Sequence, residues 1–197
     1  MQVVRLAKPN ANGKMFTWPT GSGIREMVPP HLAKKYKAAT KIKTLVITEG
    51  NWKSLVSGEL FEFNLYGIPG INNWGPKNTK AAFPTLLKII DRCKVKNVIF
   101  LVDADAFDVE WREGKDLYRR PENFRRALFS FKEKLSDTDV FLQFAWIKKE
   151  YQCKGIDDLL IKYADKSKAI IRDICKIAGN CKYVEKVDVT SMPYTRS

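Results

Sequence analysis

Short apolar runs rich in β-branched residues alternate with amphipathic stretches of helical length from residue 43 onward. The predicted strands are Thr44–Thr48, Phe63–Ile68, Asn97–Val102, Val140–Trp146 and Tyr183–Val189. The predicted helices are Trp52–Phe61, Thr79–Cys93, Pro121–Leu135, Ile156–Tyr163 and Lys166–Ile177. Because parallel neighbours need a crossover connection, this alternation predicts an α/β fold with a mostly parallel, four-stranded sheet flanked by helices.

The first 42 residues differ from the rest because they carry several prolines and glycines among aromatic residues and lysines. We expect an irregular lead-in over 1–42, in which Met15–Pro19 and Ile24–Val28 form a short hairpin and His31–Thr40 forms a short basic helix. An arm packed irregularly on the core is the alternative to the hairpin. The main domain is expected over 43–189, followed by a flexible tail over 190–197.

The chain has 197 residues and carries 35 Lys and Arg against 22 Asp and Glu, a net charge of +13. With 45% apolar residues it has enough hydrophobic side chains to close a core, which excludes global disorder. The charge favours nucleic acid as a partner, and a lysine-rich solvated surface is the alternative. Four cysteines without a C-x-x-C pair and a single histidine argue against structural zinc. No apolar run has the length of a membrane span, so we expect no membrane partner and a cytoplasmic protein.

Acidic residues follow two of the predicted strands. Glu49 and Gly50 follow the first strand, and Asp103 and Asp105 follow the third, separated by Ala104. Ligands of open α/β sheets bind beyond the carboxyl ends of the strands, and residues two apart on a strand point to the same side. Three hard oxygen donors without imidazole or thiolate favour Mg²⁺ or Mn²⁺. Each motif alone is also typical of a turn or a helix cap.

A second group of charged residues opens the helix after the fourth strand. Asp157 and Asp158 fall in the first helical turn, where they serve either as caps that suit the helix dipole or as part of the acidic site. Lys154 just before them, and Lys53 four residues after Glu49, could each contact a phosphate, against ordinary solvent exposure as the alternative.

Candidate nucleic-acid contacts lie in two segments. Trp74, in a glycine-rich loop after the second strand, could stack on a base, although a buried Trp that closes the loop is the commoner outcome. The best candidate for a phosphate-contacting patch is a basic segment that contains Arg112, Lys115, Arg119, Arg120, Arg125 and Arg126. The alternative is that these residues form a solvated loop and helix face without a ligand.

Several of these motifs together match a known family. They are the lead-in Trp18–Gly23, the run Leu45–Gly50, the loop Gly67–Gly70, the strand end Val102–Asp105 and the segment Lys154–Leu160. Over most of its length the chain resembles the Toprim-like domains. It is most similar to the DUF3854 group found in primase and helicase proteins of phages, plasmids and other mobile elements.

The resemblance implies a Rossmann-like Toprim fold in which Glu49, Asp103 and Asp105 bind Mg²⁺ or Mn²⁺. It gives Glu49 a second role as acid or base, makes Lys154 part of the catalytic set, and gives Asp157 or Asp158 a supporting role at the metal. The implied reaction is primase-type nucleotidyl transfer in DNA replication. The implied partners are single-stranded or primed DNA, nucleotides, and a helicase or other replication domain. A non-catalytic DNA-binding module and a Toprim nuclease are the alternatives.

Overall fold

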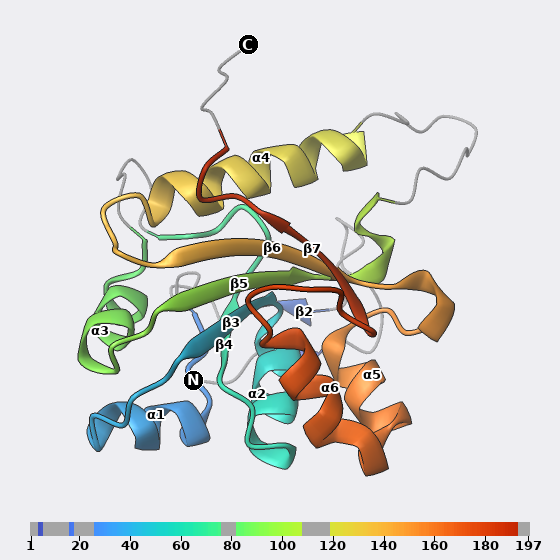
Figure 1. The fold of residues 1–197 in the computed structure, drawn as a ribbon, viewed down its shortest axis with the longest axis horizontal. Coiled ribbons are helices and arrows are strands. Elements are labelled where there is room, and N and C mark those ends of the chain that lie inside the picture. Colours follow the sequence, from blue (N-terminus) through green and yellow to red (C-terminus); the bar gives the residue numbers. More distant parts are fainter. Residues whose placement is uncertain (1–3, 6–15, 18–25, 76–81, 108–118, 193–197) are drawn as a thin grey trace.

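The computed structural model describes residues 4–5, 16–17, 26–75, 82–107 and 119–192 (Figure 1). The strands are β1 (Val4–Arg5), β2 (Phe16–Thr17), β3 (Thr44–Glu49), β4 (Leu65–Ile68), β5 (Asn97–Val102), β6 (Phe141–Ile147) and β7 (Val184–Asp188). The helices are α1 (Pro30–Lys37), α2 (Asn51–Leu60), α3 (Pro84–Arg92), α4 (Arg119–Lys134), α5 (Ile156–Lys162) and α6 (Ser167–Ile174). Short 3-10 turns are η1 (Ala104–Phe107), η2 (Lys149–Tyr151) and η3 (Ala164–Lys166).

The main sheet has the strand order β4-β3-β5-β6-β7. The pairs β3–β4, β3–β5 and β5–β6 are parallel, which confirms the predicted α/β architecture. The predicted number of four strands is wrong, because β7 adds a fifth strand that runs antiparallel to β6, with Val184 opposite Ile147. The alternation of strands and helices along the sequence predicts the parallel crossovers of the sheet. β7 follows two successive helices, so no strand–helix–strand unit in the sequence places it in the sheet.

The predicted hairpin in the lead-in is wrong among the described residues. Phe16 and Thr17 pair with Arg5 and Val4, not with residues 26–28, the described part of the second predicted strand. Met27 instead forms an antiparallel bridge to Gly67 on β4. β4 is an edge strand whose outer backbone groups need partners, and Met27 supplies one. The first residues of the predicted flexible tail are also held, since Leu142 N donates to Thr190 Oγ1 at 2.8 Å.

Helices cover both faces of the sheet, with α3 and α4 on one side and α2, α5 and α6 on the other (Figure 1). β5 shows the alternation clearly, because Phe100 packs in the cluster with α3 and α4 while Ile99 packs in the cluster with α5 and α6. All six residues of β5 are buried, as expected for a central parallel strand covered on both faces. In the part of the chain that the structure describes, no helix combines the length and apolarity needed to cross a membrane.

Small residues bring α2 close to the edge of the sheet. A Cβ atom added to Gly67 of β4 would lie 2.2 Å from Ser54 Oγ and 3.0 Å from Met27 Cβ. Ser54 and Ser57 on the facing side of α2 are fully buried. This close packing fixes the first turn of α2 at the carboxyl edge of the sheet, directly after Glu49.

Candidate functional site

The predicted acidic residues lie at the carboxyl ends of two neighbouring strands. Glu49 is the last residue of β3, Asp103 follows β5 directly, and Asp105 lies in η1. β3 and β5 are parallel, with Thr48 opposite Leu101, so Glu49 and Asp103 leave the sheet side by side. The structure therefore brings Glu49 and the aspartate pair to one edge.

Two lysines lie among these carboxylates. Lys53 Nζ, in the first turn of α2, donates to both carboxylate oxygens of Asp103, at 2.5 Å for Oδ2. Lys154 Nζ lies 3.7 Å from Asp105 Oδ2. The Lys53 and Asp103 side chains are only 23% and 14% exposed, whereas the Lys154 side chain is 65% exposed. Lys53 thus forms a half-buried ion pair, and Lys154 forms a looser one at the surface.

The pKa values of Glu49 and Asp103 are both raised despite these lysines. Burial raises the pKa of Glu49, and the negative charge of Asp103 raises it further against the opposing effect of Lys53 and Lys154. Burial also raises the pKa of Asp103, and this effect exceeds the stabilisation from Lys53. A site in which two carboxyls resist ionisation is suited to a further cation.

Lys53 is seated between two glycines. Gly50, which precedes α2, has a φ of 99°, and a Cβ on it would lie 3.7 Å from both Cγ and Cδ of Lys53. A Cβ on Gly155, which precedes α5, would lie 3.1 Å from Lys53 Cε and 2.6 Å from Asp157 Oδ1. Ala104 N donates to Lys154 O at 2.8 Å and ties the loop before α5 to the end of β5. Gly155 therefore leaves room for the lysine stem, whereas Gly50 is needed for its positive φ.

The two aspartates of α5 have different surroundings. Asp158 Oδ2 accepts a hydrogen bond from Gly155 N at 3.1 Å, so the Asp158 carboxylate caps the start of α5. This is the capping role that the sequence offered as the alternative to a place in the acidic site. Asp157 Oδ1 is buried and has no hydrogen-bond partner in the described part of the chain. It lies against the glycine that also contacts Lys53. Asp157 is thus the better candidate of the two for a supporting acidic role.

The chemistry of these donors fits a divalent cation. They are hard carboxylate oxygens, two of the carboxyls resist ionisation, and a buried oxygen of Asp157 has no partner. Among the described residues, however, no three His, Cys, Asp or Glu side chains are grouped closely enough to hold a metal ion. The lysines are bonded to the aspartates in this arrangement, so the donors suit a cation but are not gathered around one position.

The predicted nucleic-acid contacts have mixed outcomes. Trp74 is 1% exposed, its ring centroid lies 4.6 Å from that of Phe100, and its Nε1 donates to Ile71 O, so the prediction that it stacks on a base is wrong. The loop-closing alternative is confirmed. A base-stacking role would have needed an exposed ring, whereas the aromatic side chains of β5 and α4 bury this one.

The basic patch is described only in part. Arg112 and Lys115 lie outside the described residues, and Arg119 and Arg120 begin α4, whose backbone contacts η1 at the carboxyl edge. Arg125 is exposed, with its guanidinium 6.0 Å from the centre of the Phe129 ring. Arg126 is paired with Glu122 at 2.5 Å. The start of α4 therefore lies beside the acidic edge.

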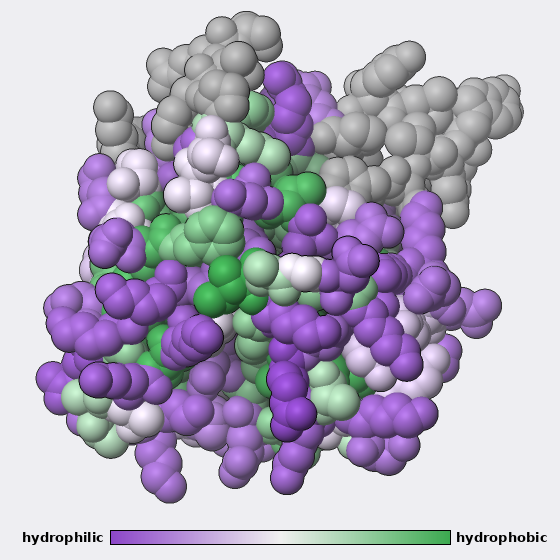
Figure 2. All heavy atoms as spheres, in the orientation of Figure 1, coloured by the Kyte–Doolittle hydropathy of each residue, from purple (hydrophilic) through white to green (hydrophobic). Residues whose placement is uncertain are grey.

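Hydrophilic residues also dominate the face of the molecule shown in Figure 2.

Trp52 is a candidate that the sequence reasoning missed. It lies in the first turn of α2 between Glu49 and Lys53, and it is 55% exposed. The signal was present in the sequence, because Ser54, Ser57 and Gly58 are small residues suited to a tightly packed helix face, which leaves Trp52 pointing away from it. A large exposed aromatic side chain thus lies beside the acidic edge.

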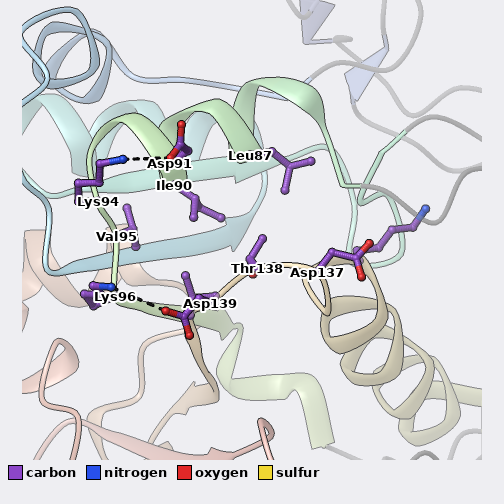
Figure 3. Close-up of a pocket in the computed structure, with 11 residues that line it drawn as sticks. Leu87, Ile90, Asp91, Lys94, Val95, Lys96, Asp137, Thr138 and Asp139 are labelled. Carbon is purple, nitrogen blue, oxygen red and sulfur yellow. Dashed lines mark hydrogen bonds and ion pairs between the residues drawn. The ribbon is translucent and has the colours of Figure 1, made fainter.

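A pocket lies at the opposite edge of the sheet (Figure 3). Leu87, Ile90 and Val95 are among its apolar lining residues. Two ion pairs lie among its charged residues: Lys94 with Asp91 at 3.1 Å and Lys96 with Asp139 at 3.9 Å. It adjoins the amino ends of β5 and β6, away from the edge where α/β sheets bind their ligands. The carboxyl edge is therefore the candidate functional site.

No protein-family model matches this chain, and no curated protein or solved structure is significantly similar to it.

Proposed function

We propose that this chain is a Toprim-like domain that uses Mg²⁺ or Mn²⁺ to act on nucleic-acid phosphates, by primase-type nucleotidyl transfer in the DNA replication of a mobile element or phage. The observation that carries the proposal is the convergence of Glu49, Asp103 and Asp105 at the carboxyl edge, with the pKa values of Glu49 and Asp103 raised. The net charge of +13 supports a polyanionic substrate.

Glu49, Asp103 and Asp105 would hold the cation, with Asp157 in support. When bound, such an ion neutralises phosphate charge and stabilises the transferred phosphoryl group. Lys154 is exposed beside Asp105 and can contact a substrate phosphate. Glu49, whose pKa is raised by burial and by the charge of Asp103, is the candidate for the residue that accepts or donates a proton.

The test is to incubate the purified chain with nucleotides on a single-stranded DNA template, and separately with supercoiled plasmid, each with Mg²⁺ and with EDTA. The proposal predicts nucleotide incorporation that requires Mg²⁺. Plasmid nicking without incorporation would favour a Toprim nuclease and contradict the proposed reaction.

A non-catalytic DNA-binding module is the second candidate, because Lys53 and Lys154 pair with Asp103 and Asp105 in this arrangement. For this function DNA affinity falls steeply with salt and is indifferent to EDTA. Salt-dependent binding without either Mg²⁺-dependent activity would favour it over the first candidate.

Replacement of Trp52 by alanine is expected to weaken binding of single-stranded DNA by about 1–3 kcal/mol, the usual contribution of one base stacked on an aromatic ring. The indole is exposed beside the acidic edge, where a template base would pass. Fluorescence anisotropy of a labelled oligonucleotide measures the change. Trp52→Phe should retain most of the affinity.

Leu60→Ala is the matched control, because Leu60 is 68% exposed on the same helix but lies at its far end. Equal affinities for the wild type, Trp52→Ala and Leu60→Ala proteins would show that Trp52 does not stack on DNA.

A further inference from the structure

Lys53 holds Asp103 through both of its carboxylate oxygens. A cation that binds Asp103 must take at least one of these oxygens, so it competes directly with the lysine ammonium. A divalent ion and an ammonium at adjacent positions also repel each other strongly, because the side chains concerned are mostly buried. Asp103 therefore binds either Lys53 or a metal ion, and simultaneous binding of both is unfavourable.

The position of Lys53 is built into the fold. The lysine stem passes Gly50 and Gly155, and a Cβ on Gly155 would lie 3.1 Å from its Cε. The Lys53 stem therefore packs against the loop that precedes α5 and is not freely solvated. Its Nζ contacts Asp103, which is 50 residues away in the sequence and lies on a different strand end. These contacts indicate a placed cation, not a mobile surface charge.

The same pairing accounts for the spacing of the carboxylates. Glu49, Asp103 and Asp105 lie at one edge, yet the described residues contain no group of three acidic, His or Cys side chains arranged as metal ligands. Lys53 supplies one positive charge where a divalent ion would supply two.

We propose that Lys53 is an internal cation that occupies Asp103 in the metal-free protein and is displaced when a divalent ion binds. Lys53 is thus a positioning residue that lowers the affinity of the site for the metal ion. This inference rests on the proposed function, but its test measures metal affinity and needs no turnover.

The test is titration of the metal-free protein with Mn²⁺ at constant pH and salt, with free Mn²⁺ followed by electron paramagnetic resonance. Lys53→Met keeps an unbranched stem that fits between the glycines but removes the charge. We expect its Kd for Mn²⁺ to fall about tenfold or more, because the competing charge is gone. Lys53→Arg keeps the charge and should bind Mn²⁺ no more tightly than the wild type.

Lys96→Met is the matched control, because it removes one positive charge at the opposite edge of the sheet, where Lys96 lies 3.9 Å from Asp139. The Kd of Lys96→Met for Mn²⁺ should change less than about twofold, since salt screens an exposed charge at the opposite edge of the sheet from the proposed metal site. Circular dichroism verifies that each variant is folded. Lys53→Gln serves as a second neutral variant if the Lys53→Met protein does not fold.

The outcomes separate this inference from the proposed function. Equal Mn²⁺ affinities in the wild type and the folded neutral variants would overturn the role of Lys53 and leave the metal site standing. Absence of Mn²⁺ binding in all of the proteins would overturn the metal site itself. Tighter binding in Lys53→Met and Lys53→Gln but not in Lys96→Met supports the inference.

Discussion

Replacement of Glu49 by glutamine is expected to lower Mg²⁺-dependent nucleotide incorporation by about 100-fold or more while the protein stays folded. Even residues that only orient a metal ligand typically contribute 10- to 100-fold, so removal of a direct carboxylate ligand should cost at least as much. Glutamine preserves the shape of the side chain at the end of β3 but removes the charge. Initial rates at saturating template measure the effect.

The same substitution is expected to leave the metal-free protein at least as stable as the wild type at pH 7. The pKa of Glu49 is raised by burial and by Asp103, so the folded state binds this proton more tightly than the unfolded state. Below about pH 4.3, the ordinary pKa of a glutamate, Glu49 is protonated in both states and its ionisation costs no stability. As the pH rises from there through the raised pKa of the folded state, the ionisation of Glu49 lowers the free energy of unfolding progressively. Glutamine avoids that cost, and urea unfolding in EDTA at pH 4 and pH 7 measures it.

Glu185→Gln is the matched control for both measurements, because Glu185 is exposed on β7. It should change neither the incorporation rate nor the unfolding free energy appreciably. Full activity in Glu49→Gln would remove Glu49 from the site. A large loss of stability in the same variant would mean that any loss of activity reflects unfolding.

Replacement of Trp74 by alanine is expected to lower the free energy of unfolding by about 3–5 kcal/mol, the usual cost of truncating a buried large aromatic residue. Trp74 packs against Phe100 of β5 at 4.6 Å and Phe131 of α4 at 5.2 Å between ring centroids. It also holds the loop after β4 through its Nε1 bond to Ile71 O. Urea unfolding followed by far-ultraviolet circular dichroism measures the loss.

Trp74→Phe is the control, because it keeps an aromatic ring and loses the hydrogen bond and some volume. We expect a smaller loss for Trp74→Phe and an unchanged affinity for single-stranded DNA, since the indole is buried. A Trp74→Ala protein within about 1 kcal/mol of the wild type would contradict the packing described for this loop.

The central strands and the acidic edge could be predicted because they depend on local sequence. The apolar run of β5 and the aspartates that follow it are contiguous, and a parallel sheet places such strand ends at one edge. The last helix was predicted over Lys166–Ile177, but α6 ends earlier, at Ile174. Helix ends are set by individual hydrogen bonds and are less visible in a hydrophobic pattern.

The contacts that decide the chemistry could not be predicted in the same way. The bonds from Lys53 to Asp103 join residues on different elements, and the burial of Trp74 depends on Phe100 and Phe131, which are distant in the sequence. The last strand was predicted as a strand, but its place in the main sheet depends on how the segment after α6 returns along β6. Each of these features depends on tertiary packing, which leaves no local pattern.

The most direct test of the acidic site is a crystal soaked in Mn²⁺ and measured at a wavelength where manganese scatters anomalously. We expect an anomalous peak bound by Glu49, Asp103 and Asp105, with Lys53 Nζ moved away from Asp103. Crystals without a peak at this edge, in which Lys53 still donates to both oxygens of Asp103, would contradict it.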